Sequence, residues 1–197
     1  MKTDIILAGV GGQGILSIAA SLGAAALNEN YFLKQAETHG MSQRGGAVVS
    51  HLRISDKPIY SDLIPRGGAD IILSVEPMES LRYLPCLSQK GSLVTNVSEY
   101  KNIPNYPDLK DVFRNLEKRI NIVRIDADKV AHEIGNPKAS NMVMLGAASP
   151  FISIHEEIIL KGIETIFKAK GAEVVKLNIE AFRSGRRFAE SVLQKDN

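Results

Sequence analysis

Four glycines within six positions form the feature of this sequence best suited to bind a ligand. They lie in the stretch GVGGQG, residues 9–14, where Gly9, Gly11 and Gly14 satisfy the spacing G-x-G-x-x-G. Glycines at this spacing permit a tight turn and a close approach of a ligand to the backbone. A helix that begins there offers unpaired N–H groups and a dipole worth about 0.3–1 kcal/mol to an anion. The turn therefore suits a phosphate, and it suits a carboxylate of a partner protein equally.

The segments on either side of this turn predict a strand and a helix. Residues 4–8 form a short apolar run typical of a buried parallel strand, and residues 15–27 are rich in Ala, Leu and Ile and lack proline, as in a buried helix. YFLKQAE, which starts at Tyr31, is predicted as the second strand and completes a βαβ unit. The glycine turn thus lies at the carboxyl edge of the predicted sheet, where open α/β folds bind ligands.

A second glycine-rich segment follows the second predicted strand. Residues 38–46 read THGMSQRGG and place polar donors beside Arg44 and a pair of glycines. This pattern is typical of an anion-binding nest, in which backbone N–H groups and a guanidinium converge. The alternative is a glycine-rich connection with Arg44 exposed to solvent. Because both segments follow predicted parallel strands, we expect them to share one edge of the sheet, where they would form a single ligand site.

A nicotinamide dinucleotide is one ligand that the first motif predicts. This interpretation requires an acidic residue at the end of the second strand to hold the ribose hydroxyls, and Glu37 is the candidate, although it comes slightly late. A further interpretation is that the glycines only let the helix pack closely against the sheet and that no ligand binds there. A P-loop is excluded, because no Gly-Lys-Ser/Thr follows the glycines.

Other patterns of catalytic or metal-binding residues are absent from the sequence. The four histidines show no metal-ligand spacing, and there is no G-x-S-x-G nucleophile elbow. Glu76 precedes Pro77 at a predicted strand end, where it is either a site carboxylate or the start of a helix. The single cysteine, Cys86, excludes an internal disulfide and a four-cysteine iron–sulfur cluster held by this chain alone, and fits a cytoplasmic protein. No residue is assigned as an acid, base, nucleophile or metal ligand.

Composition predicts a soluble globular protein. The 197 residues are 44% hydrophobic and 23% charged, which is typical of a single α/β domain spanning residues 1–197. A net charge of +2 predicts neither a nucleic-acid partner nor an anionic membrane partner. Residues 5–27 carry no charge, but five glycines and Gln13 interrupt them, so we predict a soluble segment rather than a membrane helix.

Strands and helices alternate along the rest of the chain. GGAVVSHLRIS is predicted as an antiparallel insertion or hairpin, SDKPIYSD as a turn with a short extended piece, and YKNIPNYPDLKD as a loop. ADIILSVEP, GSLVTN and NIVRID predict further strands, and the tail predicts helices. The fold class is therefore a three-layer α/β/α, Rossmann-like domain with a mostly parallel sheet, an antiparallel insertion and C-terminal helices.

Five longer segments carry a resemblance to a known family. They read GVGGQGI, AETHGMSQRGGAVVSHLRIS, SDLIP, ADIILSVEPMESLRYL and NMVMLGAASPF, in this order. Together they resemble the gamma-type subunit or domain of 2-oxoacid:ferredoxin oxidoreductases, and most closely the small subunit of the indolepyruvate type. The resemblance covers nearly the whole chain, and this ordered series is far more specific than a glycine fingerprint.

The resemblance implies a complex that oxidatively decarboxylates arylpyruvates such as indolepyruvate to aryl-acetyl-CoA, with ferredoxin as electron acceptor. Thiamine diphosphate, Mg²⁺ and iron–sulfur clusters carry the chemistry in that family. This chain lacks the family's thiamine-diphosphate motif, a Gly-Asp-Gly followed by an asparagine pair, and it has one cysteine. We therefore expect these cofactors on a larger partner subunit, contact with ferredoxin through the complex, and no activity of this chain alone.

The resemblance also implies which residues face the partner. They are Gly9, Gly11, Gly12, Gln13 and Gly14 of the first motif, and Ser42, Gln43, Arg44, Gly45 and Gly46 of the second. We expect them to line the face toward the partner's active site, where they help to hold coenzyme A phosphates or order the partner's loops. A free-standing NAD-dependent dehydrogenase and a pure scaffold remain the alternatives.

Overall fold

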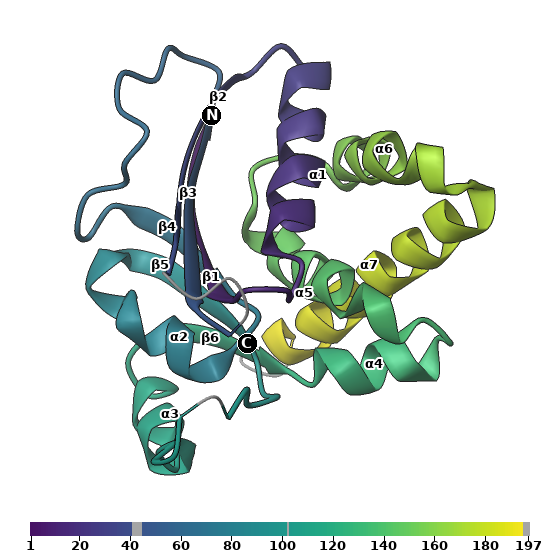
Figure 1. Cartoon of the computed structure of the whole chain (residues 1–197). Helices are drawn as coiled ribbons and strands as arrows, with labels where there is room; N and C mark the ends of the chain where they lie inside the picture. The colour runs from purple at the N-terminus through teal and green to yellow at the C-terminus, as the bar shows by residue number, and fades with distance from the viewer. Residues whose placement is uncertain (41–44, 102, 195–197) are drawn as a thin grey trace.

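The computed structural model describes residues 1–40, 45–101 and 103–194 and shows one mixed sheet between two layers of helices (Figure 1). The strand order is β2-β3-β1-β4-β5-β6. The strands are β1 (Lys2–Val10), β2 (Phe32–His39), β3 (Ala47–Ser55), β4 (Ala69–Ser74), β5 (Leu87–Asn96) and β6 (Asn121–Ile125). The α-helices are α1 (Ile15–Asn28), α2 (Pro77–Arg82), α3 (Lys110–Leu116), α4 (Ala127–Glu133), α5 (Ser140–Ala148), α6 (Glu156–Phe167) and α7 (Ala172–Leu193).

Each face of the sheet has its own hydrophobic core. Along β1, Ile5 and Leu7 point into the larger core, which contains residues of α1, α5, α6 and α7, whereas Ile6 points into the smaller one. The smaller core lies under α2 and α3 and includes the buried ring of Phe113. This alternation follows from the two-residue period of a strand. The predicted three-layer α/β/α architecture is confirmed (Figure 1).

The antiparallel strand β3 occupies a place that the sequence did not indicate. It pairs with both β1 and β2, so β2 runs parallel to β1 but is separated from it by one strand. The prediction of a βαβ unit is therefore wrong in one respect: its two strands are not neighbours in the sheet. The physical reason is hydrophobicity: β3 buries Val48, Leu52 and Ile54, whereas the largely polar β2 tolerates the sheet edge. The predicted antiparallel hairpin is confirmed, and β1, β4, β5 and β6 pair in parallel.

Two further segments differ from the sequence prediction. The loop predicted at residues 100–111 ends at Leu109, because α3 begins at Lys110 and Phe113 anchors this helix in the smaller core. The connection between β3 and β4 contains no extended strand. The Arg53 guanidinium instead fixes this connection by donating hydrogen bonds to the carbonyls of Ser61 and Leu63 while it pairs with the buried carboxylate of Asp4.

Helices α5 and α7 cross at two glycines. A Cβ atom added to Gly146 would lie 1.8 Å from the carbonyl oxygen of Phe182, and one added to Gly185 would lie 1.9 Å from that of Val143. The backbones are therefore in direct contact, which holds the two helices in one arrangement. Within the described ranges, no helix has the length and apolar character needed to cross a membrane.

Candidate functional site

The glycine turn joins the end of β1 to the start of α1 through backbone that only glycine adopts easily. Gly12 and Gly14 have φ angles of 97° and 81°, in the left-handed region. The Gln13 side chain closes the turn, because its Oε1 accepts a hydrogen bond of 2.8 Å from the N–H of Val10. Gln13 therefore shapes the turn, and α1 begins directly after Gly14.

The two glycine-rich segments meet at the carboxyl edge of the sheet. The N–H of Gly11 donates a 2.9 Å hydrogen bond to the carbonyl of Gly46, and Gly9 pairs with Val48 on β3. This contact joins Gly11 of the first motif to Gly46 of the second, which lies 35 positions further along the sequence. Three candidates of the second motif, Ser42, Gln43 and Arg44, lie outside the described residues.

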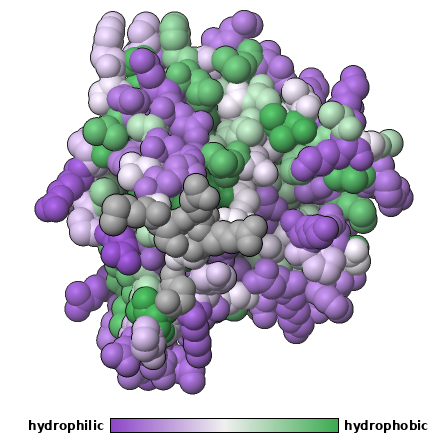
Figure 2. Space-filling model, viewed as in Figure 1, coloured by the Kyte–Doolittle hydropathy of each residue, from purple (hydrophilic) through white to green (hydrophobic). Residues whose placement is uncertain are grey.

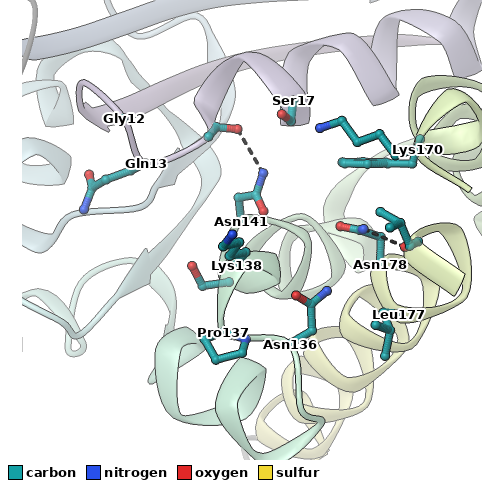
Figure 3. Close-up of a pocket in the computed structure, with 14 residues that line it drawn as sticks. Gly12, Gln13, Ser17, Asn136, Pro137, Lys138, Asn141, Lys170, Leu177 and Asn178 are labelled. Atoms are coloured by element: carbon teal, nitrogen blue, oxygen red, sulfur yellow. Dashed lines mark hydrogen bonds between the residues drawn. The ribbon is translucent and has the colours of Figure 1, made fainter.

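Two hollows flank the start of α1. A groove of about 370 Å³ lies between α1 and the strands and is lined by Gly11, Gly12, Leu16, His39 and Val48, among others. A cavity of about 670 Å³ lies between α1 and the helices α5 and α7 (Figure 3). Gly12 and Gly14 line both of them. A ligand in either hollow would therefore contact the glycine turn.

Glu37 is poorly placed for the role that NAD binding requires. It lies on β2, and β3 separates β2 from β1, so Glu37 is two strand spacings, about 9–10 Å, from the strand that carries the turn. Its carboxylate contacts His39 and Gln35 of the same strand. The acidic residue of a dinucleotide fold stands on the strand next to the glycine turn, so this arrangement argues against NAD.

Glu76 lies at the same edge, fully buried after β4. Its carboxylate accepts hydrogen bonds from the N–H of Glu79 at 2.8 Å, from the hydroxyl of Tyr106 at 2.5 Å and from the N–H of Tyr100 at 3.3 Å. The first bond confirms Glu76 as the start of α2. The other two hold the loop that follows β5.

This loop supports the second glycine segment. The ring of Tyr100 lies 3.8 Å from the position that a Cβ on Gly45 would take, so the loop packs beside that segment. Sequence reasoning missed Tyr100 and Tyr106, because no local pattern indicates that these residues form hydrogen bonds to the carboxylate of Glu76. Burial, and the hydrogen bond to Glu76, raise the pKa of the Tyr106 hydroxyl.

We expect the stability of the chain to fall between pH 10 and pH 11.5 because of Tyr106. The unfolded phenol loses its proton near pH 10, whereas the raised pKa keeps the folded phenol protonated, so unfolding releases a proton and becomes easier as pH rises. The free energy of unfolding should fall by less than the limiting value of about 1.4 kcal/mol per pH unit, because the ring is partly exposed. Urea denaturation at several pH values measures it.

Tyr106→Phe is the matched control for this pH dependence. It removes the hydrogen bond at every pH, at a cost of about 1–3 kcal/mol, and should flatten the alkaline slope. Tyr83, whose pKa is also raised by burial, leaves a smaller residual slope. If the free energy of unfolding depended on pH equally in the unchanged chain and in Tyr106→Phe, Tyr106 would not be the group that titrates.

No group of three or more His, Cys, Asp or Glu side chains in the described part of the chain is arranged to hold a metal ion. Cys86 is half-buried and is a free cysteine, not part of a disulfide.

Comparison with known proteins identifies the family. The model of the pyruvate ferredoxin/flavodoxin oxidoreductase family matches residues 4–188. The chain belongs to this family. It is 37% identical to "Indolepyruvate oxidoreductase subunit IorB" of Pyrococcus horikoshii over 96% of this chain and 97% of that protein. The same identity and coverage hold for the protein of that name in Thermococcus kodakarensis.

Solved structures of the oxidoreductase family share the fold. A 2-oxoglutarate:ferredoxin oxidoreductase from Magnetococcus marinus, with 2-oxoglutarate, coenzyme A and succinyl-CoA bound, matches with a TM-score of 0.78 and 23% identity over 96% of this chain. The match spans 31% of the Magnetococcus chain. The gamma subunit of a keto/oxoacid ferredoxin oxidoreductase from Geobacter sulfurreducens matches with a TM-score of 0.70 and 22% identity, over 96% of this chain and 99% of that one. The resemblance to gamma-type subunits drawn from the five sequence segments is confirmed.

Proposed function

We propose that this chain is the small subunit of an indolepyruvate-type 2-oxoacid:ferredoxin oxidoreductase. The observation that carries the proposal is 37% identity, over nearly full length, to indolepyruvate oxidoreductase subunits of two archaea. In the proposed reaction, an arylpyruvate loses CO₂, its acyl group is transferred to the thiol of coenzyme A, and an electron pair passes to ferredoxin. The product is an aryl-acetyl-CoA.

In this proposal the catalytic cofactors belong to a larger subunit. An iron–sulfur cluster of the four-cysteine type needs four thiolates, and this sequence has one cysteine. Thiamine diphosphate and Mg²⁺ are assigned to the same partner, because the sequence lacks the motif that holds them in the family. The proposed contribution of this chain is a surface that completes the partner's active site.

The carboxyl edge of the sheet suits that contribution. The groove between α1 and the strands joins both glycine-rich segments, and the first helix directs its positive end toward it. The Leu16 side chain beside the turn is 55% exposed, which favours contact with another protein. On the face shown in Figure 2, hydrophobic residues occur as small groups between hydrophilic ones. We propose that this edge faces the partner's active site and that its N–H groups hold coenzyme A phosphates.

Co-expression with candidate large subunits tests the function. The chain alone should neither reduce ferredoxin nor bind NAD, whereas the co-purified complex should reduce ferredoxin with indolepyruvate in a reaction that requires coenzyme A. Phenylpyruvate, pyruvate and 2-oxoglutarate define the substrate range. Binding of NAD by the isolated chain, together with failure to co-purify with any large subunit, would overturn the proposal in favour of a dehydrogenase.

Arg44→Ala tests the part played by the second motif. We expect a folded variant that assembles normally but has a lower activity in the complex, with the Michaelis constant for coenzyme A raised by about tenfold through loss of one charged contact. Arg66→Ala, at an exposed arginine in the connection before β4, is the matched control. Unchanged steady-state kinetics of the Arg44 variant with every substrate, coenzyme A included, would contradict this role.

A further inference from the structure

Strand β6 leaves one edge of the sheet without a neighbouring strand. It is last in the strand order and pairs only with β5 within the ranges that the structure describes. A groove of about 490 Å³ lies against this strand. Residues at and before β6 line it together with one residue from each helix layer: Ile120, Asn121, Ile122, Arg124, Glu117 after α3 and Val192 of α7. The groove therefore opens along the sheet edge, between the two layers of helices.

The hydrogen bonds of β6 determine which of its backbone groups face the groove. The carbonyl of Ile125 accepts a 3.0 Å hydrogen bond from the N–H of Val97, which follows β5. Each strand residue directs its N–H and C=O to one side, and the next residue directs them to the other side, so Val123 faces β5 as Ile125 does. The N–H and C=O of Ile122 and Arg124 therefore face outward, and they have no hydrogen-bond partner among the described residues.

The composition of β6 does not protect this edge from pairing. Natural edge strands commonly carry lysine, other charged residues or proline, which prevent the addition of another strand. The opposite edge follows this rule, because β2 contains Lys34 and Glu37. In contrast, β6 reads NIVRI and contains neither lysine nor proline. Its one charged side chain, Arg124, lies over the ring of Phe113 and pairs with Glu117. This composition favours an edge that another strand covers.

A second copy of β6 fits this edge in a register that uses every outward group. Antiparallel pairing about a two-fold axis at Val123 places Ile122 of one copy opposite Arg124 of the other. Each outward N–H of one copy then meets an outward C=O of the other. An axis at Ile122 would instead place Arg124 opposite Ile120, whose N–H already donates to the carbonyl of Leu116. The backbone therefore favours the axis at Val123.

The charges beside β6 favour the same register. Lys118 and Arg119 come just before the strand, and Asp126 and Asp128 come just after it. All four are exposed, and none forms an ion pair with a described residue. In an antiparallel pair, the basic start of each strand lies beside the acidic end of the other, and the axis at Val123 sets Lys118 opposite Asp128. The edge is thus complementary in charge to a second copy of itself, and symmetry makes each contact twice.

We propose that β6 is a dimerisation edge, at which a second copy of this chain adds its own β6 in the antiparallel direction and joins the two sheets into one. The edge is separate from the candidate site, because β4 and β5 lie between β6 and the strand β1 that carries the glycine turn. The inference goes beyond the proposed function and does not depend on it.

Sedimentation equilibrium of the full chain tests the proposal. With rising concentration, the mass should increase from 21.5 kDa toward twice that value. Lys118→Glu sets like charges opposite each other at two symmetric places and should weaken the dimer at least about tenfold. Adding Asp128→Lys to this variant restores opposite charges and should restore the dimer. Lys57→Glu makes the same charge change at an exposed residue after β3, and this matched control should dimerise as the unchanged chain does.

Amide hydrogen exchange identifies the edge that pairs. The N–H groups of Ile122 and Arg124 should exchange at least about tenfold more slowly in the dimer than in the dilute monomer, whereas the amides of β2 should not change. Ile122→Pro removes an N–H that faces outward, so it should prevent dimerisation while β5 and β6 stay paired. If the proline variant does not fold, Lys118→Glu at an exposed position still decides the question.

Three results would overturn the proposal. The first is a chain that stays monomeric at every concentration. The second is a dimer that Lys118→Glu weakens no more than Lys57→Glu does. The third is protection of Ile122 and Arg124 only in the complex with a co-purified large subunit, which would assign this edge to that subunit. Ferredoxin reduction by the complex is measured separately, so the proposed function can stand when this inference fails.

Discussion

Gly185→Ala should destabilise the chain by about 3 kcal/mol or more, a large share of the 5–15 kcal/mol that stabilises a typical domain. The added Cβ would lie 1.9 Å from the carbonyl oxygen of Val143 and 3.0 Å from the N–H nitrogen of Ala147. Both atoms belong to the backbone of α5, so no side-chain rotation relieves the overlap. The helices must separate, and the buried contacts of Phe182 with the larger core are lost. Urea denaturation followed by circular dichroism measures the free energy of unfolding.

Gly23→Ala is the matched control for this prediction. Gly23 also lies inside a buried helix, but a Cβ there would meet only the side chain of Leu33, at 3.3 Å. The atom met is the end of the partly exposed Leu33 side chain, and alanine favours helix by about 1 kcal/mol over glycine, so we expect Gly23→Ala to be neutral or stabilising. If Gly185→Ala were as stable as Gly23→Ala, the direct contact between the α5 and α7 backbones would be wrong.

Gly12→Asp should lower the ratio kcat/KM for coenzyme A in the assembled complex by about a hundredfold. Gly12 is exposed at the start of α1, and a Cβ there meets no atom within 4 Å. The new carboxylate would lie where the proposed function places coenzyme A phosphates. Two like charges about 4 Å apart near a protein surface repel by up to about 4 kcal/mol, and salt reduces this value. Because the φ angle of Gly12 strains any other residue, the free energy of unfolding of the variant is measured beside its activity.

Gly12→Asn separates charge from backbone strain in this experiment. The φ angle of 97° at Gly12 costs any other residue some strain, and Asn and Asp bear positive φ values better than most. The two variants have nearly the same shape and differ by one charge. We expect Gly12→Asn to lose only a few-fold in kcat/KM. Equal values for the two variants would show that no anion binds beside Gly12.

The sequence determined most of the secondary structure and both glycine motifs. The short apolar runs of β1, β4, β5 and β6 and the helical periods of α6 and α7 are local patterns, and local patterns predict local structure. The motifs at residues 9–14 and 38–46 also indicated the family, because each of them is one unbroken stretch of sequence. A shared sheet edge followed from the direction of parallel strands, and the hydrogen bond from Gly11 to Gly46 bears this out.

Tertiary structure alone decided which segments became neighbours. Both β2 and β3 are strands by pattern, but only the competition for burial places the apolar β3 between β1 and β2, which removes Glu37 from the glycine turn. The cavity depends on the same kind of information. Lys138, Lys170 and Asn178 are distant from the glycine turn in sequence, and the fold brings them together with Gly12 and Gly14 in the lining of one cavity. Contacts between distant segments are set by the packing of the whole core, which no short stretch of sequence contains.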